Sequence, residues 1–469
     1  MLETLVSALA LLLYYLFLKL RAYDRAYLEM NKKDWKINLL PAPSLFARLF
    51  NIIVGNFGAS LLITLLEMTR IKFAIKKSLK QMEEAEASGK VPAILCNASA
   101  RKALKERFTN YAENMRTSDA LNAYAKIFLY SGTLVFLSNH VGLLQLGMEA
   151  HDEVVHNPVF IVSMPRTATT ILHRTMATDT SHWRAFDLAD SMMPLPPVFR
   201  SDRASRKKRA ENVQRTMINP LKRIVPGWFE CLATMDYKAP DQIDEDLGLC
   251  NPGIGIAYQD TLMHLHPEEK SSLESVELAT YRFAWLDMMM RIHQKLEPDN
   301  DKTWLMKDPK HSAFLPQLIQ QFPGARFIFI HRSPDDILAS MAKLFLCFTC
   351  VSVIPGASGT TSAEWGQYAL ERTKFYSDGI VQYSKAHHMD ENKRIDILFS
   401  ELVPDVVGSI ERIYERCFNQ KPSEEAKAIM QSYLDQYKFE KKENQPRSLE
   451  DFHLTEQDLS FDEYREMFL

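Results

Sequence analysis

A turn that carries one cation and three hydroxyl groups lies near the middle of the chain. It spans residues 164–170 (MPRTATT), follows the apolar run 159–163 (VFIVS) and leads into a helical pattern. Backbone N–H groups and hydroxyls at the start of a helix bind anions, and the helix dipole favours negative charge there. The turn around Arg166 therefore predicts a phosphate site, although a threonine cluster that only caps the helix explains these residues equally well. The sequence contains no GxxxxGK[ST] phosphate loop.

A second anion site is predicted where another apolar run ends. Residues 326–331 (RFIFIH) are followed at once by Arg332, and Ser340 lies about two helical turns further on. A guanidinium and a hydroxyl in this arrangement can grip a phosphate. Two anion sites at neighbouring strand ends predict a ligand with two separate phosphates.

A third polar segment, residues 304–311 (WLMKDPKH), lies between these two sites in the sequence. It offers a cation, Lys307, and an imidazole, His311, where a short apolar run ends. A solvated turn with ordinary charged residues is the alternative interpretation. Because unperturbed imidazole titrates near pH ~6.5, His311 is our first candidate for a general base.

All three polar segments follow short apolar runs that alternate with helical patterns. The runs at 159–163, 303–306, 326–331 and 394–399 are rich in β-branched and aromatic residues, as expected for strands buried on both faces of a parallel sheet. Strands that alternate with helices predict an α/β domain. Ligands of such sheets bind beyond the carboxyl ends of the strands, which is where the polar segments lie.

Composition narrows the class of protein. The chain has 469 residues, of which 46% are hydrophobic and 25% are charged, enough for two or three packed domains. A net charge of −3 argues against a dedicated nucleic-acid binder, because phosphate-backbone binding needs a strong basic excess. Only 16 glycines argue against a turn-rich all-β fold. Six cysteines in a chain of this length do not form a disulfide framework.

The N-terminal region is hydrophobic. Residues 4–18 form an uncharged apolar run that is followed by Lys19, Arg21 and Arg25, and the run is shorter than the ~20 residues of a comfortable membrane span. With no small-residue cleavage site after it, the run predicts an uncleaved anchor within residues 1–30, and a buried helix is the alternative. The positive-inside rule would leave the body of the protein cytosolic.

A second uncharged run, residues 49–66, is interrupted by Gly55, Asn56 and Gly58. It fits a membrane-contacting hairpin, a span or a core segment. Helical periodicity continues from there to about residue 148. We therefore expect a helical region over residues 31–150 and a catalytic domain over residues 151–469.

Taken in order, the motifs resemble a known family. The segments FIVSMPRTATT, WLMKDPKH, FPGARFIFIHRSPDDILAS, ILFSELV and PRSLEDFHL resemble the sulfotransferases that use 3′-phosphoadenosine 5′-phosphosulfate, above all the branch with a PRTGTT loop and a KSPxHL segment. The resemblance covers about residues 157–469. It implies a three-layer sandwich with a central parallel sheet, the sulfotransferase fold related to the phosphate-loop nucleoside triphosphatases.

The resemblance also implies roles for individual residues. Arg166 would hold the 5′-phosphosulfate, Arg332 and Ser340 the 3′-phosphate, and Lys307 would neutralise charge at the bridging oxygen. Phe399 would pack near the adenine. The other donor-binding residues that it implies are Thr167, Ala168, Thr169, Thr170 and, in a C-terminal basic loop, Arg447.

Four positions depart from the family pattern. Ala168 replaces a glycine, so a positive φ at this position would be strained. Asp308 replaces a serine and adds negative charge near an anionic donor, His453 replaces a glycine, and Ile171 stands where some relatives have a tryptophan that stacks on adenine. None of these changes removes a cation or hydroxyl needed for the two phosphates.

The general base has two candidates. The branch keeps a histidine in KSPxHL, which favours His311. The runner-up is Glu245 with Asp246, because the segment PDQIDED matches an acidic PEED-like element of the branch. Sulfuryl transfer needs in-line positioning, cations and a base, and the sequence shows no ligand cluster with metal spacing, so we expect no metal.

The sequence thus predicts a membrane-associated sulfotransferase that acts on a hydroxyl of a small, lipophilic acceptor such as a sterol. Apolar residues 192–195 and 344–354 are candidates to line the acceptor pocket. We expect an endomembrane location with a cytosolic catalytic domain, a lumenal Golgi location being the alternative. Two other functions stay open: a non-catalytic nucleotide-binding or scaffold protein that keeps the fold, and another nucleotide-dependent transferase. The oligomeric state is not predicted.

Overall fold

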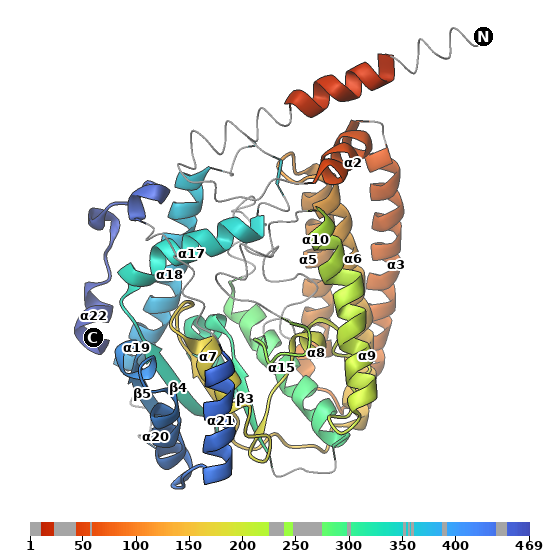
Figure 1. Cartoon of the computed structure of the whole chain (residues 1–469). Coiled ribbons are helices and arrows are strands. Elements are labelled where there is room, and N and C mark those ends of the chain that lie inside the picture. Colours follow the sequence, from red (N-terminus) through yellow and green to blue (C-terminus); the bar gives the residue numbers. More distant parts are fainter. Residues whose placement is uncertain are drawn as a thin grey trace.

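The structure is a computed structural model, and its elements are labelled in Figure 1. A parallel sheet with helices on both faces forms one part of the molecule, and a bundle of long helices forms the other (Figure 1). The residues that it describes are 11–22, 44–56, 59–224, 239–246, 274–297, 302–349, 353–354, 357, 361–386, 392–437 and 448–469.

The sheet has five parallel strands in the order β2-β3-β1-β4-β5. Four of them coincide with the predicted strands, which confirms the α/β class. The fifth, β2, has two residues and no apolar run of its own, so the sequence pattern could not reveal it. The strands are β1 (Val159–Val162), β2 (Trp183–Arg184), β3 (Thr303–Lys307), β4 (Arg326–His331) and β5 (Arg394–Leu398).

The two faces of the sheet bury different side chains, since successive residues of a strand point in opposite directions. Phe160 and Val162 of β1 enter a core with α15, α16, α17 and α18, whereas Val159 and Ile161 enter a core with α7, α20 and α21. The sheet therefore lies between two helical layers, as a three-layer sandwich requires.

The described helical elements after β1 alternate with the remaining strands along the sequence. They are α7 (Thr169–Met176), α8 (Leu188–Met192), α9 (Arg203–Val213), η2 (Gln214–Ile218), α10 (Asn219–Ile224), α15 (Val276–Lys295), η4 (Pro309–Phe314), α16 (Leu315–Gln321), α17 (Pro334–Thr349), α18 (Ser362–Ala386), α19 (Phe399–Leu402), α20 (Val406–Phe418), α21 (Glu424–Gln436), η5 (Leu449–Phe452), η6 (Glu456–Asp458) and α22 (Asp462–Phe468).

The described part of the N-terminal region consists of helices joined by short turns. Its core is built from α3, α5 and α6 together with the outer face of α15, which contributes Trp285 and Met288. The elements are α2 (Leu45–Asn56), α3 (Ala59–Ser88), α4 (Ala93–Cys96), α5 (Ala98–Thr117) and α6 (Ala123–Glu149).

The two hydrophobic N-terminal runs have different surroundings. Run 49–66 is divided between α2 and α3, with residues 57–58 outside the described residues, and Ile52 is buried where α2 packs on α3 and α6. Residues 11–22 form a helix whose apolar side chains are mostly exposed, Leu11 by 69% and Tyr14 by 61%. Among the described helices, α6 is long and apolar enough to cross a membrane, but half of its apolar window is buried in the bundle.

Candidate active site at the carboxyl ends of the strands

The loop between β1 and α7 is held by its own hydroxyl groups. Ser163 Oγ donates to the carbonyl of Ile330 at 2.6 Å, and Thr167 Oγ1 donates to the carbonyl of Met164 at 2.9 Å. Thr167 is fully buried, so its hydroxyl shapes the loop. Thr169 and Thr170 form the first turn of α7, and Thr170 Oγ1 accepts a hydrogen bond from Lys307 at 3.2 Å.

Two residues of this loop have left-handed backbone conformations. Arg166 has φ 67° and Ala168, at the N-cap of α7, has φ 64°. Each costs a non-glycine residue about 1–2 kcal/mol, and such strain is concentrated at functional loops. The position at which the family has a glycine thus does need a positive φ here. Where right-handed and left-handed residues follow one another, successive N–H groups can point toward one anion.

The second predicted anion cluster lies against the first. Arg332 donates from Nη1 to the carbonyl of Arg166 at 2.8 Å, and Arg166 donates from Nε to Ser340 Oγ at 2.9 Å. The guanidinium of Arg332 lies 4.2 Å from the centre of the Phe399 ring. Burial lowers the pKa of Arg332, but an arginine stays cationic. The structure therefore brings together four residues that the sequence places up to 233 positions apart.

Lys307 ends β3 beside the first turn of α7. Its Nζ lies 2.6 Å from Glu245 Oε1, and the side chains of Lys307 and Glu245 are 3% and 15% exposed. The acidic segment is fixed there by the backbone, because Asp246 N donates to the carbonyl of Lys307 at 3.2 Å. A mostly buried carboxylate thus pairs with the buried cation that also contacts the Thr170 hydroxyl.

His311 and Asp246 form a second buried pair next to this one. His311 Nε2 lies 3.0 Å from Asp246 Oδ2, and the two side chains are 2% and 1% exposed. The rings of Phe160 and Phe283 enclose the imidazole, with centroids at 5.3 and 5.6 Å. Burial alone would lower the pKa of His311, but the Asp246 carboxylate outweighs it and raises that pKa above the usual value.

Asp308, between Lys307 and the η4 turn, is fully enclosed. Its Oδ1 accepts a hydrogen bond from the backbone N–H of Lys310 at 2.8 Å, and burial raises its pKa to about 7. A carboxyl group with this pKa is largely protonated below neutral pH. The additional negative charge expected from Asp308 is therefore weakened by burial.

The sequence offered Glu245 and His311 as alternative bases. In the structure they belong to two adjacent ion pairs, Glu245 with Lys307 and His311 with Asp246. The sequence shows that Glu245 and Asp246 are neighbours. It does not show that they bind different partners, because Lys307 and His311 lie 62 and 65 residues away from them. Arg447 lies outside the described residues. His453 adopts φ 55°, a conformation that glycine adopts more readily.

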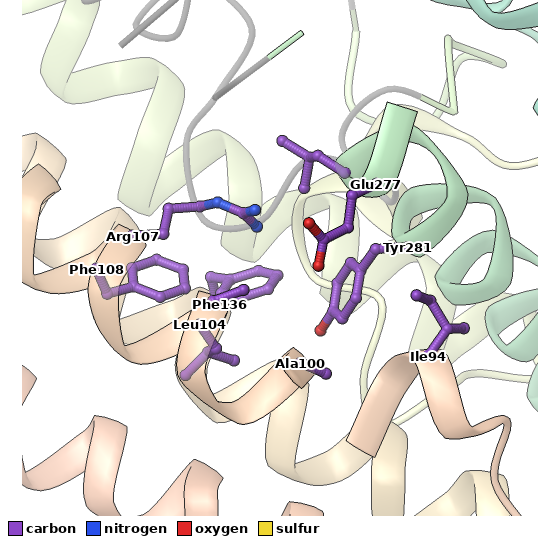
Figure 2. A pocket seen from close by; sticks show the side chains of 10 residues that line it. Ile94, Ala100, Leu104, Arg107, Phe108, Phe136, Glu277 and Tyr281 are labelled. Carbon is purple, nitrogen blue, oxygen red and sulfur yellow. The ribbon is translucent and has the colours of Figure 1, made fainter. Parts of the chain in front are cut away.

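The structure also shows a cavity in the helical layer (Figure 2). It lies between α5, α6 and α15, and Arg107 and Glu277 point toward one another across it (Figure 2). Its free volume is about 20 Å³, room for roughly one water molecule. This cavity is too small for an organic acceptor.

Comparisons with known proteins agree on one family. A family model described as "Sulfotransferase family" matches residues 158–418. Curated relatives from Mycobacterium bovis and Mycobacterium tuberculosis, both named omega-hydroxy-beta-dihydromenaquinone-9 sulfotransferase, are 21% identical over 285 residues, or 57% of this chain. The match covers 64% of each relative's length, which is less than two-thirds.

Two solved structures share the fold. Sulfotransferase STF9 from Mycobacterium avium matches with a TM-score of 0.64 and 19% identity, over 83% of this chain and 96% of its own. Sulfotransferase STF1 from Mycobacterium tuberculosis matches with a TM-score of 0.60 and 18% identity, over 82% and 98% of the two chains. Both matches extend well beyond residues 158–418, into the helical layer or the C-terminal elements.

Proposed function

Since the chain belongs to the sulfotransferase family, we propose that it moves a sulfuryl group from 3′-phosphoadenosine 5′-phosphosulfate to a hydroxyl of a small, lipophilic acceptor. The observation that carries the choice of donor is the contact between the two anion clusters. Arg166 lies in the loop between β1 and α7 and donates to Ser340, while Arg332 donates to the Arg166 carbonyl. A ligand with phosphates at both ends of one nucleoside suits two cationic clusters that touch.

The residues present fit such a donor. Thr169 and Thr170 offer the N–H groups and hydroxyls of a helix start, Arg332 offers a guanidinium for the 3′-phosphate, and Phe399 offers an aromatic face beside it. The adenine contact of Phe399 and the part of Arg447 and Ala168 in donor binding stay predictions of the family resemblance. Among the described residues no group of three or more His, Cys, Asp or Glu side chains could hold a metal ion, and the absence of a metal requirement stays a prediction from the sequence.

In the proposed reaction, the acceptor oxygen forms a bond to sulfur while the bond from sulfur to the 5′-phosphate oxygen breaks, and a base takes the hydroxyl proton. Lys307 would stabilise the charge that develops on the leaving oxygen, because it contacts Thr170 in the first turn of α7. Arg166, which contacts the second cluster in this structure, would share its charge between the two phosphates.

We propose Glu245 as the base and His311 as its support. A base must reach the proton that it takes, and the Glu245 side chain is 15% exposed whereas His311 is 2% exposed and enclosed by two phenylalanine rings. His311 binds Asp246, the next residue after Glu245, so it anchors the acidic segment. Donor phosphates would draw Lys307 away from Glu245 and release the carboxylate.

The acceptor and the membrane location are proposed from the names of the relatives and from the N-terminal helix. The mycobacterial relatives are named for a hydroxylated menaquinone, a lipophilic alcohol, and a sterol or another lipid alcohol would be of the same class. The exposed apolar helix at residues 11–22 suits a membrane that holds such an acceptor. We propose an endomembrane location with the catalytic part in the cytosol, and the Golgi lumen as the alternative.

The test is transfer of ³⁵S-labelled sulfuryl from the donor to lipid alcohols by the detergent-solubilised full chain. Glu245→Gln keeps the size of the side chain and removes the base, so we expect kcat to fall by about 10²–10⁴-fold. Glu401→Gln, which disrupts the exposed ion pair with Arg412, is the matched control and should leave the rate unchanged. If His311→Asn abolishes transfer while Glu245→Gln retains it, the base is His311.

A further inference from the structure

The C-terminal helix α22 lies along the β5 edge of the sheet, close to α18 and near the carboxyl ends of β4 and β5 (Figure 1). None of its residues stood out in the sequence as a candidate for chemistry. Its side chains nevertheless contact residues directly before and just after Arg332, the cation assigned to the 3′-phosphate.

The first contact holds the end of β4. Tyr464, which is 2% exposed, places its hydroxyl 2.9 Å from Nδ1 of His331. The other ring nitrogen of His331 lies 2.7 Å from Asp396 Oδ1 on β5. Phe468 stacks on the imidazole with its centroid at 4.4 Å and an interplanar angle of 6°. The residue before Arg332 is thereby fixed on three sides.

The second contact holds the start of α17. Arg465 donates from Nε and Nη2 to both oxygens of Asp335, at 2.6–3.0 Å. The same carboxylate accepts a hydrogen bond from Ser333 Oγ at 2.8 Å. A two-pronged arginine–carboxylate pair has a defined geometry, so it fixes the turn that follows Arg332.

From these contacts we propose that α22 positions Arg332, with Tyr464 and Arg465 as positioning residues that set the preference of the site for nucleotides carrying a 3′-phosphate. This inference rests on the proposed donor. Arg332 itself contacts the Arg166 carbonyl and the Phe399 ring, and its backbone is held from both sides by one helix. Small displacements of an arginine weaken a phosphate contact strongly, because the bond depends on direction.

The experiment is a calorimetric titration of the full chain with 3′,5′-adenosine bisphosphate and, separately, with 5′-AMP. The variants are Tyr464→Phe, Arg465→Ala and the double variant. The matched control is Lys385→Ala, which removes the exposed ion pair between Lys385 of α18 and Glu463 of α22 and leaves the contacts around Arg332 intact. We expect the double variant to lose about tenfold in affinity for the bisphosphate, with little change for AMP and none in the control.

Arg465→Lys keeps the charge without the two-pronged geometry, so it should fall between wild type and Arg465→Ala. If the folded variants keep the wild-type ratio of bisphosphate to AMP affinity, whether or not both affinities fall, the positioning role is overturned. The donor assignment then stays in place. A wild-type chain that binds neither nucleotide would instead contradict the proposed function, and this inference with it.

Discussion

At the scale of single residues, each site cation is held by a group of the protein itself. Glu245 binds Lys307, Ser340 accepts from Arg166, and the Arg166 carbonyl accepts from Arg332. A buried cation that lost its partner would be unfavourable, so these contacts keep the charges in place until an anion replaces them. Because the donor must replace these contacts, the free energy of the contacts should reduce the affinity for the donor.

The carboxyl group of Asp308 should make stability depend on pH. An aspartate in an unfolded chain has a pKa near 3.9, and burial raises the pKa of Asp308 to about 7 in the fold, where Asp246, Glu245, His311 and Lys310 are the charged neighbours. The folded state binds this proton more tightly, so its contribution to stability falls as pH rises from about 4 to about 7.

Asp308→Asn keeps the oxygen that accepts from Lys310 N and removes the titration. We expect the free energy of unfolding to rise by about 1–2 kcal/mol at pH 8 and by much less at pH 5. Urea unfolding at the two pH values measures this difference. The exposed Asp435→Asn variant serves as the control, and parallel pH profiles for wild type and Asp308→Asn would show that Asp308 is not the titrating group.

At the scale of elements, three strand ends deliver the site. The carboxyl ends of β1, β3 and β4 carry the Arg166 loop, Lys307 and Arg332, which lie together because β1 is flanked by β3 and β4 in a parallel sheet. The sequence could predict these strands, since strands buried on both faces appear as continuous apolar runs. It could not place the segment 239–246, whose backbone pairs with residues 186–189 and with the end of β3.

The loop at the start of α7 offers a test at this scale. Ala168 (φ 64°) and Ala177 (φ −67°) flank the same helix, and both pack against the same core. Replacing either by glycine removes a methyl group and adds backbone freedom, but only Ala168→Gly also relieves a left-handed conformation. We expect Ala168→Gly to be more stable than Ala177→Gly by about 1–2 kcal/mol. Equal losses in thermal unfolding would contradict the strain.

At the scale of the whole molecule, α15 joins the two parts of the structure. Its Phe283 face packs on the sheet and its Trp285 face packs on the helical bundle. The sequence predicted a helical region before the α/β domain, but not that one helix serves both cores. The contacts of α22 were equally unpredictable, because Tyr464 and His331 are 133 residues apart and no local pattern links them.

The helix at residues 11–22 should determine where the molecule resides. Its exposed leucines and aromatic rings, followed by Lys19 and Arg21, suit the interface of a membrane. Deletion of residues 1–22 should move the protein from the vesicle fraction to the soluble fraction in flotation with anionic vesicles, without changing nucleotide binding. Unchanged flotation would assign membrane contact to another surface.

The measurement that tests the central claim most directly is a calorimetric titration of the full chain with 3′,5′-adenosine bisphosphate and with 5′-AMP, in wild type and in Arg332→Ala. Arg412→Ala, an exposed arginine paired with Glu401, is the control. We predict micromolar binding of the bisphosphate, weaker binding of AMP by about 10²-fold, and loss of that difference in Arg332→Ala alone. A folded chain that binds neither nucleotide, or binds both equally, would contradict the two-phosphate site and the donor proposed from it.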